Sequence, residues 1–101
     1  MSPDAPVMTV LEGRVPVERA TELNRLYTEA SRSLPPQMLH TLLVQSTADP
    51  AVWRGISIWR SRAALEEYRR SVATPAGIQM FQSVGAQPAV SMWDVAVNLS
   101  A

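Results

Sequence analysis

Two tryptophans, Trp53 and Trp59, stand six residues apart in a segment whose composition is typical of a β-strand. Because side chains alternate between the faces of a strand, both indoles are predicted on one face, together with Gly55 and Ser57. The small residues leave space between the two indoles. An indole beside such a space can stack on an aromatic ring, so the pattern favours a small apolar pocket. A β-bulge at Gly55 is the alternative explanation.

Three further side chains could hold or move a proton beside such a ligand. His40 is the only histidine in the chain, and imidazole normally titrates near neutral pH, so it is a candidate general base. Tyr27 and Tyr68 lie on the apolar sides of two predicted helices, where either hydroxyl could hydrogen-bond a substrate oxygen. With Trp59 these three form the candidate catalytic set. A packing role is the alternative for each of them.

The remaining candidates belong to the pocket wall. Met80 and Phe81 fall on the apolar side of the last predicted helix, where filling the core is the alternative role. The full set of candidate wall residues is Trp53, Gly55, Ser57, Met80 and Phe81. No cysteine is present, and one histidine with scattered carboxylates does not make a metal site. The four glycines are isolated, so no phosphate-binding loop is predicted. We therefore expect neither a metal nor a cofactor.

The composition limits the class of protein. A chain of 101 residues is one domain, and 47% hydrophobic residues is ordinary for a globular fold. The formal net charge is zero, which removes the long-range attraction to nucleic acid or to an anionic membrane. No apolar run approaches a membrane span, and residues 1–6 lack the pattern of a signal peptide. We expect a cytoplasmic protein whose residues 1–6 form a flexible extension.

Six elements are predicted in the order β-α-β-β-α-β. The strands cover residues 7–14, 38–45, 52–59 and 89–98. One helix runs over 17–34 and ends at Pro35-Pro36; the other starts after Ser61 as N-cap. The second helix restarts at Thr74-Pro75, with Thr74 as cap and Pro75 as first residue, and ends before Pro88. Two β-α-β halves predict an α+β, ferredoxin-like antiparallel sheet with both helices on one face.

The predicted strands are apolar on both of their faces. In the strand over 38–45, Leu39 and Leu43 have one parity, while Met38, Leu42 and Val44 have the other. A sheet covered by helices on one face only should instead alternate apolar and polar residues. A second copy of the chain, packed sheet against sheet about a two-fold axis, would cover the other face. We therefore expect a homodimer.

The stretch from Ile58 to Leu65 resembles the strand-three ending W-x-S-x-x-A-L of the antibiotic biosynthesis monooxygenase family. Thr74-Pro75, Phe81 and Pro88 also match the family pattern, and the similarity covers almost the whole chain. The resemblance implies a dimeric α/β barrel with Trp59 in its pocket. It also implies a role in secondary metabolism: oxidation of a small aromatic, phenol- or anthrone-like molecule by dioxygen without a cofactor.

The chain departs from the family pattern at two informative places. Quinone-forming members often carry an Asn four residues before the Trp, where this chain has Gly55. Haem-degrading members use an Asn on the first strand and a His on the second helix, and neither is present, so haem degradation is not expected. A non-oxidative isomerase or cyclase, a binding protein for a hydrophobic metabolite, and a dimer with a filled cavity stay open as alternatives.

Overall fold

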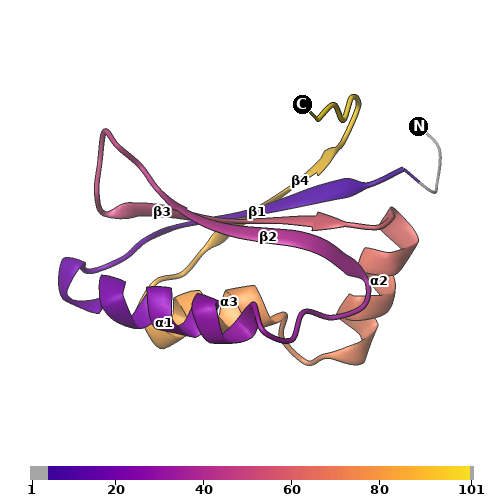
Figure 1. Cartoon of the computed structure of the whole chain (residues 1–101). Helices are drawn as coiled ribbons and strands as arrows, with labels where there is room; N and C mark the ends of the chain where they lie inside the picture. Colours follow the sequence, from indigo (N-terminus) through magenta and orange to yellow (C-terminus); the bar gives the residue numbers. More distant parts are fainter. Residues whose placement is uncertain (1–4, 101) are drawn as a thin grey trace.

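One sheet and three α-helices make up the computed structural model, which describes residues 5–100 (Figure 1). The strands are β1 (Val7–Arg14), β2 (Met38–Gln45), β3 (Val52–Trp59) and β4 (Ala89–Asp94). They lie in the order β2-β3-β1-β4, and every neighbouring pair is antiparallel. The expected extension over residues 1–6 falls mostly outside the described residues.

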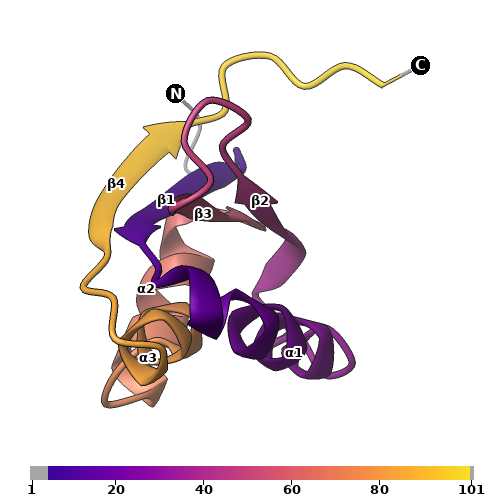
Figure 2. The same cartoon turned by 90° about the vertical axis from the view of Figure 1, so that its left-hand side faces the viewer.

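The helices all cover the same face of this sheet (Figures 1 and 2). They are a 3-10 turn η1 (Val17–Arg19), α1 (Ala20–Ala30), α2 (Arg62–Ser71) and α3 (Ala76–Ser83). The other face, which we call the open face, carries no helix. The predicted ferredoxin-like α+β fold is therefore confirmed.

The first helix is shorter than the sequence predicts at its C-terminal end. α1 ends at Ala30, and the residues from Ser31 on form a turn in which Ser33 N–H bonds the Ala30 carbonyl. A residue that precedes a proline is sterically disfavoured from helical geometry, so Leu34 cannot belong to the last turn. The prediction of helix up to Leu34 was wrong: the proline accounts for Leu34, and the turn begins at Ser31.

The second helix is divided as predicted, but its restart is capped differently. The Ser61 hydroxyl accepts a hydrogen bond from the Ala64 N–H at 3.0 Å, which confirms the predicted N-cap of α2. α3, however, has Pro75 as its N-cap and Ala76 as its first residue, with no side-chain cap from Thr74. A side chain from α2 takes that role, as described below.

The last strand is also shorter than predicted. β4 ends at Asp94, and only the hydrogen bond from Val95 N–H to the Pro6 carbonyl continues the pairing. Its neighbour β1 begins at Val7, directly after a proline that has no N–H to donate. Residues 95–98 therefore lack a strand to pair with, and the chain runs away from the sheet (Figure 2).

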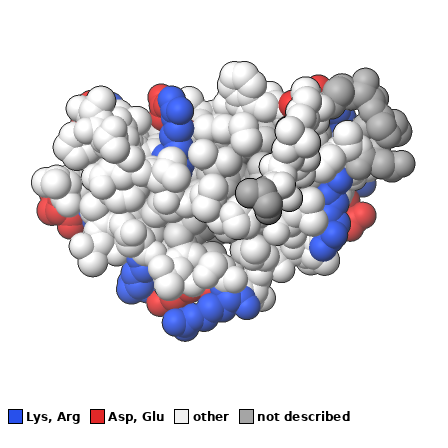
Figure 3. All heavy atoms as spheres, turned by 45° about the horizontal axis from the view of Figure 1, so that its top comes forward, with Lys and Arg blue, Asp and Glu red and all other residues white. Residues whose placement is uncertain are grey.

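The open face of the sheet is largely apolar. Val10 pairs with Ile56, which pairs in turn with Leu42, so the three align across β1, β3 and β2. Leu42 is 46% exposed, and Trp93 on β4 is 55% exposed. The surface over the sheet is mostly free of charged groups, which gather toward its margins (Figure 3). As predicted, apolar and polar residues do not simply alternate along the strands, and the face without helices is apolar as well.

Candidate functional site

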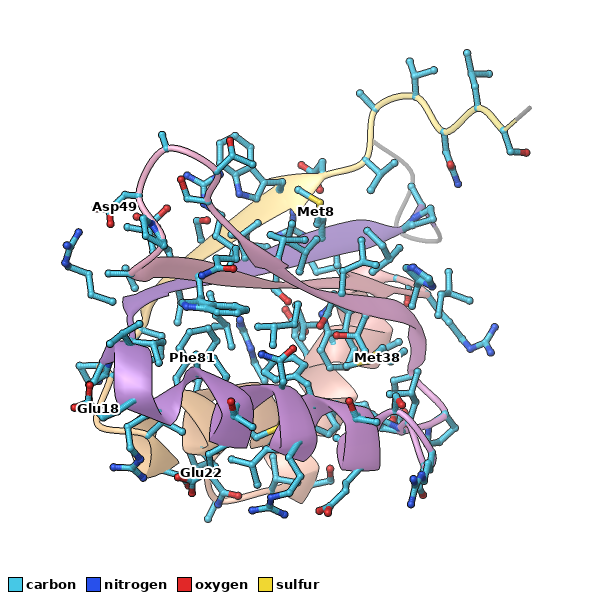
Figure 4. The ribbon with its side chains drawn as sticks, turned by 60° about the vertical axis from the view of Figure 1, so that its left-hand side comes forward. Met8, Glu18, Glu22, Met38, Asp49 and Phe81 are labelled. Carbon is cyan, nitrogen blue, oxygen red and sulfur yellow. The ribbon has the colours of Figure 1, made fainter. Side chains whose placement is uncertain are left out.

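A cavity of about 190 Å³ lies between the sheet and the helices. Figure 4 shows the layer that contains it: Phe81 and Met38 lie between sheet and helices, and Met8 lies on the open face. The wall includes a floor of strand residues, a roof of helix residues and part of the loop after α1; among its members are Thr9, Thr41, Ser57, Trp59, Tyr27, Tyr68, Met80 and Leu34. Most of the wall surface is apolar, so the cavity suits an apolar ring better than an ion-rich ligand.

The cavity exists because the core is built in two parts. One cluster surrounds Trp53 and Phe81, and the other surrounds Trp59. Six residues of β3 separate the two tryptophans by about 20 Å, at the rise of a β-strand. Between them the sheet presents Ser57 and Thr41, whose hydroxyls bond each other at 3.0 Å. These short side chains do not fill the space between the two clusters.

Trp59 is held rigidly at one end of the cavity. Its side chain is 4% exposed, and its indole N–H donates to the Thr9 hydroxyl at 2.9 Å. Its ring also packs on Tyr68, with ring centroids 5.0 Å apart and the planes tilted by 38°. A fixed indole in a cavity wall is a preformed stacking surface for an aromatic ligand.

Tyr68 has a structural duty as well as a place in the wall. Its hydroxyl oxygen accepts a hydrogen bond from the Ala76 N–H at 3.0 Å. Ala76 is the first residue of α3, and the N–H groups of a first helical turn have no partner within their own helix. The Tyr68 hydroxyl thus supplies the cap expected from Thr74, and it keeps its own proton available for donation.

Tyr27 presents its hydroxyl at the other end of the cavity. The residue is 8% exposed, and its hydroxyl lies between Gly55 of β3 and Gly77 of α3. Within residues 5–100 no hydrogen bond to this hydroxyl is found, and burial raises the pKa of Tyr27 to about 12. A tyrosine with this pKa stays protonated at neutral pH. It can therefore donate a hydrogen bond to a ligand, but it cannot act as a base.

The Tyr27 pKa predicts a stability change at alkaline pH. In the unfolded chain the phenol ionises near its ordinary pKa of 10.0, whereas in the folded chain it ionises near 12. Between these values the folded state binds more protons than the unfolded state. The contribution of the Tyr27 phenol to the free energy of unfolding is therefore complete below pH 10 and decreases as the pH rises toward 12. Denaturant unfolding from pH 9 to 12 should show a decline that is shallower in Tyr27→Phe. An equal decline in both proteins would contradict the assignment.

Gly55 is required by the position of Tyr27. A methyl group at residue 55 would collide with the Tyr27 hydroxyl, so Gly55→Ala should lower the free energy of unfolding by about 1–3 kcal/mol. Tyr27→Phe removes the obstructing oxygen. The double variant should therefore be more stable than the sum of the single effects by about 1 kcal/mol, as measured by denaturant unfolding.

Gly77→Ala is the matched control for that pair. Its methyl group would meet the Leu11 side chain at 2.7 Å and would be in ordinary contact, at 3.4 Å, with the Tyr27 hydroxyl. Its cost should add to that of Tyr27→Phe without coupling. If the costs of Gly55→Ala and Tyr27→Phe were also additive, the Tyr27 hydroxyl would not fill the space at residue 55.

The structure brings five of the sequence-predicted residues together in the cavity wall. These are Trp59, Tyr27, Tyr68, Ser57 and Met80. Three expected wall residues, Trp53, Gly55 and Phe81, lie outside the lining. Trp53 and Phe81 are buried in the first core cluster, and the space above Gly55 is occupied by the Tyr27 hydroxyl.

His40 is not part of the cavity. It pairs with Ile58 and is exposed, whereas the neighbouring pair of Thr41 and Ser57 faces the cavity. An irregularity in the pairing between Met38 and His40 sets which β2 residues face the helices. His40 therefore lies on the open face, away from the cavity. This position corrects the expectation that His40 acts as a base for a ligand bound in the cavity.

Several wall residues were not singled out from the sequence. Thr9 could have been found, because it shares parity with the buried Val7 on β1. Arg69 follows Tyr68 on α2 and is the only charged residue of the lining, which its helical position alone did not indicate.

In the described part of the chain no group of three or more His, Asp or Glu side chains could hold a metal ion. None of the helices described is long and apolar enough to cross a membrane.

The family profile described as antibiotic biosynthesis monooxygenase matches residues 6–80. That range includes β1 to β3, α1 and α2, and most of the cavity wall. The chain therefore belongs to the antibiotic biosynthesis monooxygenase family, as its resemblance implied. Among curated proteins no match to the sequence is found.

Solved structures of the same fold include oxygenases of low sequence identity. A variant of SnoaB, a cofactor-independent oxygenase from Streptomyces nogalater, is 15% identical with a TM-score of 0.69, over 95% of this chain and 98% of that chain. A Caulobacter crescentus protein proposed to be an antibiotic biosynthesis monooxygenase is 17% identical with a TM-score of 0.68, over 94% of this chain and 93% of that chain. A variant of MhuD, with manganese protoporphyrin IX bound, is 13% identical with a TM-score of 0.72, over 94% and 99%. At these identities the likeness shows the fold alone.

Proposed function

We propose that the protein is a cofactor-independent monooxygenase that oxidises a small aromatic, phenol- or anthrone-like molecule with dioxygen. The observation that carries this proposal is the cavity between Trp59 and Tyr27, which combines a fixed indole, a mostly apolar wall and tyrosine hydroxyls that can donate to a ligand. Membership of the family and the likeness to a cofactor-independent oxygenase support the same chemistry.

The reaction needs little from the protein beyond binding and orientation. An anthrone that loses a proton from its CH₂ group becomes an electron-rich anion, which passes one electron to dioxygen. The resulting radical and superoxide combine at that carbon, and the peroxide takes up a proton. Loss of water then leaves a carbonyl group. One dioxygen is consumed; one of its atoms enters the quinone and the other leaves as water.

The wall residues have distinct roles in this scheme. Trp59 stacks on the ring, and the apolar wall excludes water from the reacting anion. Tyr27 donates a hydrogen bond to the ring oxygen and so stabilises the negative charge that reacts with dioxygen. Tyr68 holds the start of α3 against the cavity through its bond to Ala76. Orientation in a dry site is the main contribution to rate.

The test is anthrone oxidation in air, followed by quinone absorbance and oxygen uptake in the presence of a metal chelator. The wild-type rate should exceed the buffer rate, with one dioxygen consumed per quinone. Ser57→Leu, which fills the cavity floor, should abolish the excess rate. Thr28→Leu on the exposed side of α1 is the matched control and should keep it. A wild-type rate equal to that in buffer would overturn the proposal.

A hydrophobic-metabolite binding protein is the second candidate. It is favoured by one observation: the wall contains no Asp, Glu or His that could take a proton from a substrate. Such a protein would bind the anthrone with an affinity that Ser57→Leu reduces, yet would leave its oxidation at the buffer rate. An isomerase or cyclase would change the ligand without oxygen uptake.

We also propose that two chains pair through the open face to form a homodimer. Val10, Ile56 and Leu42 make an apolar row across this face, and a shallow hollow of about 520 Å³ lies over β1, β3 and β4. Soluble proteins seldom expose a continuous apolar surface of this kind. A second sheet packed on the first would cover the row and the exposed Trp93 together.

A further inference from the structure

The charged and titratable groups of the cavity wall are few and all of one kind. They are Tyr27 on α1 and Tyr68 and Arg69 on α2; β1, β2, β3, β4, α3 and the loop after α1 contribute none. Each of the three donates hydrogen bonds, and only Arg69 carries a charge at neutral pH. The wall therefore offers positive charge and donors to a ligand oxygen, and no side chain that could accept its proton.

Arg69 is available to a ligand. Among residues 5–100 no salt bridge involves Arg69, although five other arginines of the chain pair with carboxylates. It is exposed and belongs to a wall that is otherwise uncharged and mostly apolar. A guanidinium in this position can pair with an anionic oxygen at the cavity margin while the aromatic ring of the ligand lies in the cavity.

Tyr27 supplies the second contact from inside the cavity. The residue is 8% exposed, and its hydroxyl lies between Gly55 and Gly77 with no hydrogen-bond partner found in the described chain. A hydroxyl that borders the cavity without a protein partner gains a hydrogen bond when a ligand oxygen reaches it, and the bond is stronger when that oxygen is ionised. Because its pKa is about 12, the hydroxyl keeps the proton that it donates.

We propose that the cavity selects aromatic ligands in their ionised form, a phenolate or enolate whose delocalised negative charge is stabilised by the Arg69 guanidinium at the margin of the cavity and by the Tyr27 hydroxyl inside it. The inference deepens the proposed function, on which it rests for the use of this cavity as the substrate site. The substrates would then be aromatic molecules that are acidic enough to lose their proton to solvent before they bind. A wall without a base can process only such molecules by anion oxidation.

The test uses 4-nitrophenol, whose phenolate is coloured and whose hydroxyl ionises near neutral pH. Titrating its colour against pH, with and without saturating protein, gives the affinity ratio of phenolate to phenol. We expect the phenolate to bind about tenfold more tightly than the phenol, which lowers the apparent pKa of the bound probe by about one unit. Arg69→Gln should reduce the ratio to about twofold or less, and Tyr27→Phe should reduce it partly.

Arg70→Gln is the matched control, since it removes the same charge from the next residue of α2, outside the cavity lining. It should leave the ratio unchanged. Equal or tighter binding of the phenol, no effect of Arg69→Gln, an equal effect of both arginine variants, or no binding of the phenolate would each overturn the inference. The readout requires no oxidation. If the cavity selects the phenolate but anthrone oxidation stays at the rate in buffer, the proposed oxygenation is refuted and the selectivity for the ionised form still holds.

Discussion

Replacing Trp59 by alanine is expected to lower the free energy of unfolding by about 3–5 kcal/mol. The indole is 4% exposed, bonds Thr9 and packs on Tyr68, so its removal leaves a hole that merges with the existing cavity. A loss of this size is a large part of the stability of a domain of 101 residues. Denaturant unfolding with tryptophan-independent detection, such as far-UV circular dichroism, measures it.

Two comparisons show whether that cost comes from the cavity wall. Trp59→Phe keeps an aromatic ring but leaves the Thr9 hydroxyl without its indole partner, so it should cost about 1–3 kcal/mol. Val17→Ala, at a site that is 81% exposed, should change stability by less than about 0.5 kcal/mol. If Trp59→Ala cost no more than Val17→Ala, the indole would not be held as described.

Replacing Ile56 by glutamate is expected to weaken the proposed dimer by about a hundredfold or more. Ile56 lies in the middle of the open face, between Val10 and Leu42, where a partner sheet would enclose it. Burying an unpaired carboxylate costs about 3–5 kcal/mol. Light scattering and sedimentation equilibrium should find twice the chain mass of 11.1 kDa for the wild type and a single chain mass for the variant.

Val17→Glu introduces the same charge at an exposed position of η1, away from the open face, and should leave the dimer intact. Circular dichroism should show that both variants keep the monomer fold. A wild-type protein that sediments as one chain at micromolar concentration would remove the dimer from the account, and so would a dimer unaffected by glutamate at residue 56.

The sequence predicted the sheet well because its patterns are local. Strand bounds for β1, β2 and β3 follow from runs of apolar residues that end at turns, and all three are confirmed. Side-chain alternation along β3 correctly predicted that Trp53 and Trp59 share a face, which the structure shows to be the one that the helices cover. Only the packing of α1 and α3 shows that Trp53 is enclosed by core residues while Trp59 borders the cavity.

The cavity itself depends on contacts between distant segments, which local patterns do not reveal. Met80 and Phe81 are neighbours on α3, yet one borders the cavity and the other fills the core. The side on which His40 lies is set by an irregular pairing with β3. The hydrogen bond from Ala76 to Tyr68 joins two helices across a turn, and no spacing rule predicts it.

The most direct measurement for the central claim is a crystal structure of the protein with anthraquinone, the product of the proposed reaction. We expect the ring system in the cavity between Trp59 and Tyr27, with a quinone oxygen within hydrogen-bond distance of the Tyr27 hydroxyl. Anthraquinone bound only on the open face, or a closed cavity in which the Trp59 indole fills the space, would contradict it.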